Sequence, residues 1–399
     1  MYILNKKMYP LLILMLNLFI ALLGQGMVIP ILPDYLKQFD AAGSAAGYLV
    51  AAFGAAQFIF SPIGGRLSDK YGRKIMILSG LFLTVISDFM FAISHELLLL
   101  YIARFIGGIG LGIMVPSVLA YVADMTTKET RAKGMGYLSA SMNLGMVLGP
   151  GIGGIIAQLG VRVPYFFASG LGLIATLLTF ILPETLTIEK RNSLKSYKKQ
   201  ESILKQFIYS FHAPYFKYLI LIFVMTFGLV NYETVYSLYV EQKYEFTSKN
   251  ISILITLGAV IGIIIQVGLI DKMIKRFGEY KLIRFSLVMT SCALLLMLLK
   301  INFLYLLVVS AIFFTFNSFL RPTVNTLLSN EAGDEQGFVS GLNNTYTSIG
   351  NVIGPVLAGN LFDKNINLPY TIGAFILLGT IIFIRGEKNL NKDGVISNG

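Results

Sequence analysis

Charge is scarce in this sequence. Asp, Glu, Lys and Arg together make up 13% of the 399 residues, whereas hydrophobic residues make up 55% and the mean hydropathy is +0.71. A soluble domain carries about 25% charged residues. The charges are also confined to short stretches between long apolar runs. This composition excludes an ordinary soluble protein and predicts a chain that is surrounded mostly by lipid.

Residues that build disulfides and metal sites are equally scarce. A single cysteine, Cys292, excludes an intrachain disulfide. The two histidines, His95 and His212, match no metal-ligand spacing, and no nucleophile motif is present. We therefore expect neither an enzyme nor a cofactor. The net charge of +11 would suggest a nucleic-acid partner in a soluble protein, but basic loops on one face of a membrane protein also produce it, so we expect no nucleic acid.

Twelve apolar runs are long enough to cross a membrane. A bilayer core of about 30 Å requires about 20 apolar residues of helix. The sequence therefore predicts an all-α membrane protein with twelve transmembrane helices, the first of which is retained rather than cleaved as a signal peptide. The runs lie near residues 8–32, 46–65, 75–94, 97–122, 135–158, 164–183, 216–240, 249–270, 280–299, 303–328, 339–361 and 368–386.

The basic residues predict how these spans are oriented. If both termini are cytoplasmic, 24 of the 32 Lys and Arg residues lie inside and 6 lie outside, and Arg104 and Arg321 fall within spans. Such an excess of basic residues is typical of cytoplasmic loops. We therefore expect a multi-pass membrane protein with both termini in the cytoplasm.

The chain is predicted to consist of two related halves. A polar segment, residues 184–215, separates six spans in residues 1–183 from six in residues 216–399. The run Gly-Met-Val-Leu-Gly-Pro at 145–150 recurs as Gly-Asn-Val-Ile-Gly-Pro at 350–355, 205 residues later, and residues 65–74 have a degraded echo 206 residues later. Such repeats are typical of transporters with a central cavity between two moving halves. We interpret the separating segment as a linker on anionic headgroups, with a regulatory role as the alternative.

The segment after the second span is a candidate gating loop. It reads Gly65-Arg-Leu-Ser-Asp69-Lys-Tyr-Gly72-Arg73-Lys74. Glycine at both ends permits a tight hairpin, and we expect Asp69 to stabilise the N-terminus of the following helix. This order of residues is more particular than a plain basic hairpin requires.

Glycines in the fifth span predict close helix packing. Gly145, Gly149 and Gly153 recur at four-residue spacing on one face, and Pro150 should bend the helix. Two interpretations remain open: packing alone, or bending and sealing against leaks during alternating access.

Two prolines, Pro30 and Pro33, predict a kink near the outer end of the first span. Asp34 follows them directly. It is either a charge on the outer surface, which we favour, or an acid of the cavity.

Charges at membrane depth are candidates for function because they are costly there. Glu233 and Arg104 fall at similar depth in the outer half of their spans. Desolvation disfavours the ionised form of an isolated carboxylate, which suits reversible protonation. Tyr232, Tyr236 and Tyr239 would add aromatic surface suited to a lipophilic cation. A structural Glu233–Arg104 pair is the alternative.

Two further charges lie within spans, and each has two interpretations. Asp88 in the third span is either a polar contact between helices or a functional acid. Arg321, before Pro322, is interpreted as a structural residue that extends its charge toward the cytoplasm or caps carbonyls that the proline frees.

At these residues the chain resembles the major facilitator superfamily over nearly its full length. Residues 65–74 are similar to the loop motif after helix two, and Arg104 with Gly108 to the helix-four motif. Residues 145–154 are similar to the helix-five motif of drug/proton antiporters, and residues 24–33 to the helix-one motif of their twelve-helix branch. The segments 227–239, 335–338 and 347–351 resemble NorA/Bmr-type multidrug efflux pumps of Gram-positive bacteria.

This resemblance implies a monomer in the bacterial cell membrane that exports amphipathic, often cationic drugs and dyes in exchange for protons by alternating access. Membrane lipids are its other expected partners. Glu233 would be the acid that responds to protons and cations, and Arg104 its electrostatic modulator. The expected cavity residues are Tyr232, Tyr236, Tyr239, Phe227, Asn317, Ser318 and Asn343. The expected gating residues are Gly65, Asp69, Gly72, Arg73, Asp124, Arg131, Gly145, Gly149, Pro150 and Gly153.

One departure from the family pattern concerns the tenth span. Ser318 stands where these pumps usually carry a second acid. Asp34 could supply the missing carboxylate, and Asp88 is a further candidate for proton coupling if Glu233 is not the site. Two other transporter interpretations remain: export of a physiological solute or lipid, and an uncoupled facilitator, which sensitivity of uphill export to a protonophore would distinguish from an antiporter.

Overall fold

The computed structural model describes residues 2–41, 43–186, 203–332 and 335–384. Most of the predicted linker therefore lies outside the described residues. Within the described part, twelve long helices correspond to the twelve predicted runs, and the all-α fold is confirmed. These helices are α1 (Tyr2–Val28), α3 (Gly43–Tyr71), α4 (Arg73–Ile93), α5 (Leu97–Met125), α6 (Lys128–Ile156), α7 (Val163–Thr179), α10 (Phe216–Tyr244), α11 (Ser248–Gly268), α13 (Glu279–Leu296), α14 (Phe303–Ala332), α15 (Gln336–Lys364) and α16 (Leu368–Gly379).

Short helices complete the described part: α2 (Leu32–Lys37), α9 (Ile203–Ser210) and α12 (Ile270–Phe277), with 3-10 turns at Ile29–Ile31, Ala157–Leu159 and Thr380–Ile384. Eight helical segments are long and apolar enough to cross a membrane, and the apolar segments Val163–Thr179 and Leu368–Ile382 are shorter. The 3-10 turn at Ile29–Ile31 contains Pro30 and separates α1 from α2, so the predicted kink is present.

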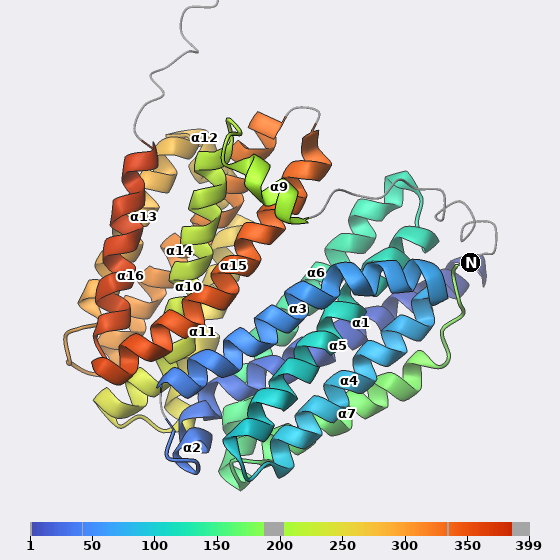
Figure 1. The fold of residues 1–399 in the computed structure, drawn as a ribbon, viewed down its shortest axis with the longest axis horizontal. Helices are drawn as coiled ribbons and strands as arrows, with labels where there is room; N and C mark the ends of the chain where they lie inside the picture. The colour runs from blue at the N-terminus through green and yellow to red at the C-terminus, as the bar shows by residue number, and fades with distance from the viewer. Residues whose placement is uncertain (1, 42, 187–202, 333–334, 385–399) are drawn as a thin grey trace, which may run out of the picture.

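The helices form two bundles that touch at one end (Figure 1). In the first half, α1 packs on α6 and α7, and α5 packs on α3 and α4. In the second half, α10 packs on α15, and α14 packs on α11 and α13. Contacts between the halves join α3 to α15 and α6 to α11. We call the end where the two halves meet the contact end. At the opposite end, which we call the divergent end, the two bundles separate (Figure 1).

The two halves repeat the same local geometry. Gly72 ends α3 with φ +115°, and Gly278, 206 residues later, lies between α12 and α13 with φ +74°. Gly145 on α6 faces the backbone of α1, and Gly350 on α15 faces the Thr226 side chain and the Phe223 carbonyl oxygen of α10. Both sequence echoes therefore mark equivalent structural positions.

Helix α7 buries its small residues and exposes its large apolar residues, as expected of a helix surrounded by lipid. Its buried face carries small residues such as Ala168, Gly172 and Ala175. Its large apolar residues Leu173 and Leu177 are instead 46% and 59% exposed. Small residues let membrane helices approach each other closely, and the large ones face the hydrocarbon.

Candidate functional site

Glu233 occupies a special position on α10. Its neighbours Tyr232 and Thr234 are buried, but Glu233 itself is exposed although protein atoms surround it. Within the described part of the chain, no hydrogen bond or ion pair reaches its carboxylate. The Glu233 side chain is therefore accessible in this conformation and can meet a solute or a proton.

The three tyrosines near Glu233 do not share its face. Tyr232, Tyr236 and Tyr239 are at most 2% exposed. The Tyr232 ring stacks on Phe313 with centroids 4.0 Å apart, and the Tyr239 hydroxyl donates to the carbonyl of Met297 at 2.7 Å. The expected aromatic surface beside Glu233 is thus not formed by these residues. Because the three tyrosines are spaced by four and three residues, they share one face of α10. That face packs against other helices of the second half. Glu233 is rotated away from it by about 100° around the helix axis.

Arg104 does not pair with Glu233. The described ion pairs do not include Arg104; its guanidinium lies 5.0 Å from the centroid of the Phe91 ring. Its electrostatic neighbours are Asp88 on α4 and Tyr165 on α7. The alternative of a structural Glu233–Arg104 pair is therefore wrong for this conformation, since the two side chains belong to different halves and Arg104 faces Asp88.

The other expected cavity residues are distributed over the second half. Phe227 is buried, and Asn317 is half-buried. The Ser318 hydroxyl faces α11, 2.9 Å from the position that a Cβ on Gly262 would take. Asn343 donates to Asn325 Oδ1 at 2.9 Å, which joins α15 to α14. Among the described contacts none joins these side chains to Glu233, and their role in a cavity remains a prediction.

Arg321 is compatible with only one of its two structural interpretations, an exposed charge that extends from the helix. It is exposed on α14, and within the described residues it donates no hydrogen bond to a carbonyl. The capping interpretation is therefore wrong here, although the helix continues through Pro322 to Ala332.

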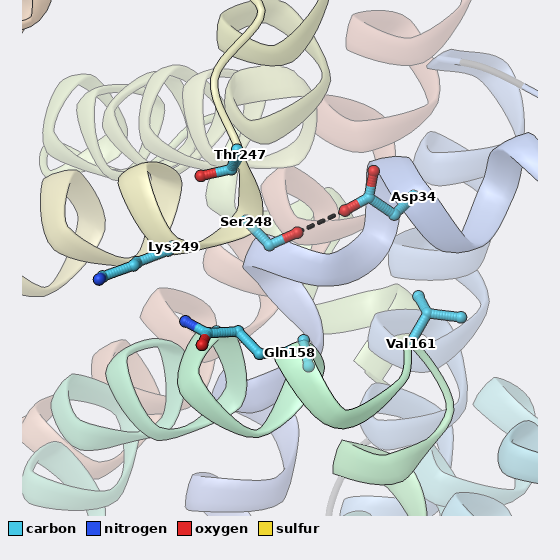
Figure 2. Close-up of a pocket in the computed structure, with 8 residues that line it drawn as sticks. Asp34, Gln158, Val161, Thr247, Ser248 and Lys249 are labelled. Atoms are coloured by element: carbon cyan, nitrogen blue, oxygen red, sulfur yellow. Dashed lines mark hydrogen bonds between the residues drawn. The ribbon is translucent and has the colours of Figure 1, made fainter.

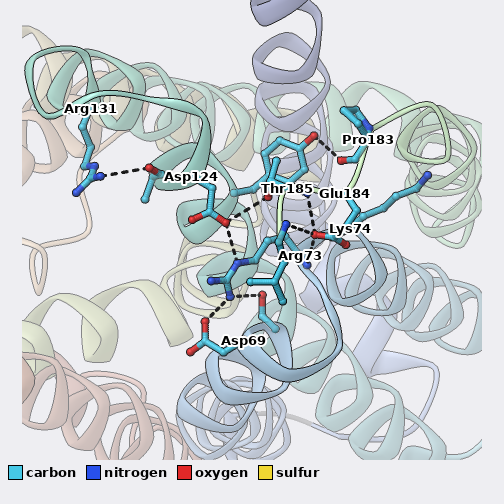
Figure 3. Close-up of polar contacts among 12 residues, drawn as sticks. Asp69, Arg73, Lys74, Asp124, Arg131, Pro183, Glu184 and Thr185 are labelled. Carbon is cyan, nitrogen blue, oxygen red and sulfur yellow. Dashed lines mark hydrogen bonds and ion pairs between the residues drawn. The ribbon is translucent and has the colours of Figure 1, made fainter. Parts of the chain in front are cut away.

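A compact polar cluster surrounds Arg73 at the divergent end (Figure 3). Arg73 is 4% exposed and forms ion pairs with Asp69 at 2.5 Å and with Asp124 at 3.2 Å. It also donates to the Ser68 hydroxyl at 3.1 Å. Arg131 donates to the carbonyl of Ala123, next to Asp124, at 3.2 Å. The structure thus joins Asp69, Arg73 and Asp124 within the first half.

The hairpin is tighter than the sequence suggested. Gly65 is helical and a Cβ there would have room, so it makes no turn; Gly72 alone separates α3 from α4. Asp69 lies in the last turn of α3 rather than at the start of α4. The start of α4 is capped instead by Glu184, whose carboxylate accepts the backbone N–H groups of Arg73 and Lys74 at 2.9 and 3.1 Å.

Sequence reasoning missed Glu184 because a cap that comes from 110 residues away leaves no local pattern. The available signal was its position, directly after the sixth span and Pro183. A carboxylate at a helix N-terminus satisfies donors that have no partner within the helix.

Polar contacts at the contact end join α2 to the second half. Asp34 accepts a hydrogen bond from the Ser248 hydroxyl (Figure 2). Lys37 forms an ion pair with Glu241. Asp34 is exposed where the two halves meet, and its surface and cavity interpretations both remain predictions. A pocket of about 400 Å³ lies here, lined by Asp34, Gly154, Ala157, Gln158, Val161, Thr247, Ser248 and Lys249.

Small residues bring the two halves together where α3 meets α15. A Cβ on Gly47 of α3 would lie 2.2 Å from the Pro355 carbonyl oxygen of α15. A Cβ on Gly43 would lie 2.7 Å from Phe362, and the Ser44 backbone N–H donates to Asp363 at 3.0 Å. The backbones of α3 and α15 therefore touch directly.

The α6 glycines make an equally close contact within the first half. Cβ atoms on Gly145, Gly149 and Gly153 would lie 2.4–2.7 Å from α1 backbone carbonyls. Pro150 lies within α6, which continues to Ile156. The Pro150 ring packs against Gly26 of α1. Both the packing and the sealing interpretation are compatible with this geometry.

Comparisons with known proteins agree with this architecture. Residues 14–355 match the family model of the Major Facilitator Superfamily. The chain is 41% identical to Multidrug resistance protein 2 of Bacillus subtilis (strain 168) over 389 residues, which cover 96% of this chain and 97% of that protein. It is 39% identical to the quinolone resistance protein NorA of Staphylococcus aureus (strain MRSA252) over 386 residues, with 96% and 97% covered.

Solved structures share the fold. The nucleoside transporter NupG aligns with a TM-score of 0.74 at 14% identity, covering 94% of this chain and 97% of that one. The human organic anion transporter MFSD10 aligns with a TM-score of 0.66 at 21% identity, covering 94% and 98%. A duplicated bundle of apolar helices, an acid inside it and a family match over most of the sequence lead to one conclusion. The chain belongs to the major facilitator superfamily and is a multi-pass membrane transporter, not an enzyme.

Proposed function

We propose that this protein is a proton-coupled antiporter that exports amphipathic, often cationic drugs and dyes across a bacterial cell membrane. The identity of about 40% to a multidrug resistance protein and to a quinolone resistance protein supports drug export. The observation that carries the coupling is the accessibility of Glu233, an acid within a membrane-spanning helix that has no protein partner among the described residues. A cationic drug and a proton would compete for this carboxylate.

The proposal assigns a direction to the structure. With both termini cytoplasmic, Gly72 and the Arg73 cluster face the cytoplasm, so the divergent end is the cytoplasmic end. Residues 1–183 and 216–399 are the two units that rock against each other, with residues 184–215 as their linker, and the protein acts as a monomer. The structure then corresponds to an inward-facing state, in which drug enters from the cytoplasm or from the inner leaflet.

Transport would follow from an exchange at Glu233. The ionised carboxylate attracts a cationic drug in a site of low dielectric, where charge interactions are strong. The contact end then opens and the cytoplasmic end closes, with the Arg73 cluster contributing to that closure. Outside, proton binding neutralises Glu233 and releases the drug, and the protonated protein returns.

The test is dye transport in vesicles of defined lipid. Purified wild type and Glu233→Gln are compared for uphill transport of a cationic dye driven by a pH gradient, with and without a protonophore. We expect the protonophore and the substitution each to abolish accumulation. The matched control is Glu245→Gln, because Glu245 is an exposed acid at the end of the same helix.

Two results would contradict the proposal. Uphill transport that survives the protonophore would remove the antiport mechanism. Transport that the protonophore stops but Glu233→Gln leaves intact would keep the antiporter and move its proton site elsewhere.

A further inference from the structure

A second group of polar side chains lies inside the first half, away from Glu233. Asp88 on α4, Arg104 on α5 and Tyr165 on α7 interact electrostatically with one another. The Asp88 carboxylate points toward α1, because one of its oxygens lies 3.4 Å from the position of a Cβ on Gly24. Three helices thus direct an acid, a base and a phenol to one place beside α1.

None of the three groups has a bonded partner in the described part of the chain. Tyr165 is 1% exposed and its hydroxyl makes no hydrogen bond. Asp88 and Arg104 are half-buried and interact electrostatically, but the described ion pairs include neither residue. Buried polar groups almost always find partners, so an acceptor and two donors that remain apart indicate an arrangement with a second, bonded state.

We propose that Asp88, near Arg104 and Tyr165, is a second proton-binding site of this transporter, located in the half that does not contain Glu233. This inference rests on the proposed proton coupling. The ionised carboxylate would accept hydrogen bonds from Arg104 and Tyr165. A proton that binds to one carboxylate oxygen gives the neutral acid and releases both donors, and Arg104 then lies over the Phe91 ring, as it does here.

The surroundings contain the groups that such a switch needs. From α5 the facing charge is Arg104, and from α7 the facing titratable group is Tyr165; at this point α1 contributes Gly24, which carries no charge. The Tyr35 phenol of α2 interacts electrostatically with Tyr165. The described chain places no other charged group against Asp88, so its ionisation depends on Arg104 and on the proton.

An aromatic stack connects this site to the contact between the halves. Phe91, one turn after Asp88, stacks on Tyr165 with centroids 4.5 Å apart, and Tyr35 lies 5.2 Å from Tyr165. Tyr35 also donates a hydrogen bond to the Phe91 carbonyl. Its neighbours on α2, Asp34 and Lys37, bind the second half. Movement of Arg104 between Asp88 and Phe91 would therefore reach the residues that hold the contact end closed.

The experiment compares two kinds of transport in proteoliposomes that contain wild type, Asp88→Asn or Asp88→Glu. Dye exchange without a gradient measures binding and movement, and uphill accumulation at one pH unit of gradient measures coupling. Each coupled proton supports about a tenfold accumulation at that gradient. We expect Asp88→Asn to exchange dye within about twofold of wild type but to accumulate about tenfold less, and Asp88→Glu to restore accumulation.

The outcomes separate this inference from the proposed function. Accumulation by Asp88→Asn equal to wild type would overturn the inference and leave the antiporter intact. A wild type that does not accumulate dye at all would overturn the proposed function first. Loss of exchange as well as accumulation in a folded Asp88→Asn protein would assign Asp88 to binding or structure and also overturn the inference.

A second variant keeps the test decisive if Asp88→Asn does not fold. Tyr165→Phe removes one hydroxyl and leaves the aromatic stack. Because that hydroxyl would stabilise the ionised acid, its loss should move the midpoint of the transport pH profile upward by about one unit. An unchanged profile would contradict the proposed site.

Discussion

Lys37 at the end of α2 forms an ion pair with Glu241 on α10 and thereby joins the two halves of the transporter across 204 residues of sequence. The Lys37 side chain is 60% exposed, whereas that of Glu241 is 17% exposed. Exposed pairs contribute at most about 1 kcal/mol. This contact can therefore bias the closed state of the contact end, but by itself it cannot lock it.

Charge reversal at this pair should weaken closure of the contact end. In Lys37→Glu two carboxylates face each other, and we expect the closed fraction to fall by up to about fivefold. The measurement is the cross-linking rate of a cysteine pair at Ser44 and Asp363, which are in contact here, on a Cys292→Ser background. The double reversal with Glu241→Lys should restore the rate; failure to restore it would show that the pair does not act through charge.

A side chain at Gly47 should prevent closure altogether. Its Cβ would lie 2.2 Å from the Pro355 carbonyl oxygen, so Gly47→Val forces α3 and α15 apart. We expect loss of the Ser44–Asp363 cross-link and of transport, with normal amounts of folded protein in the membrane. The matched control is Gly170→Val on α7, where nothing lies within 4 Å. Normal cross-linking in Gly47→Val would contradict the observed helix contact.

The two hairpin glycines should differ in their tolerance of alanine. Gly72 (ψ 152°) and Gly278 (ψ 157°) both adopt a backbone conformation that is essentially restricted to glycine. Gly278→Ala should lower the free energy of unfolding by about 1–3 kcal/mol through strain. Gly72→Ala should cost more, because its Cβ would also lie 2.4 Å from Glu184. Thermal unfolding in detergent measures both, and equal losses would argue against the Glu184 cap.

Removal of Arg73 should destabilise the first half. Arg73→Ala leaves the largely buried Asp124 without this ion pair, which should cost about 3 kcal/mol. The double variant with Asp124→Asn should recover part of that loss, because the unpaired charge is gone. Arg66→Ala is the control, since Arg66 belongs to the same motif but is exposed and bonds only within its own helix. Strictly additive losses in the double variant would contradict the coupling.

Several site predictions failed for one physical reason. The spacing of Tyr232, Tyr236 and Tyr239 places them on one face of α10, but in lipid both the interior and the exterior of a bundle are apolar. Hydrophobicity therefore cannot tell which face turns inward. Contacts with Phe313, Ser310 and Met297 decided that the tyrosines pack within the second half. The same contacts left Glu233 on the open side.

The sequence by itself determined that the chain is a membrane protein of twelve helices, where most of them begin, the kink at Pro30 and the duplication behind Gly72 and Gly278. These features follow from local rules: a helix must satisfy its own backbone in lipid, and proline and glycine act through their own dihedral angles. Only the tertiary structure decided which charges meet. Glu184 caps α4, Arg104 faces Asp88 and Lys37 binds Glu241 because helices far apart in sequence pack side by side, and such pairings have no local signature.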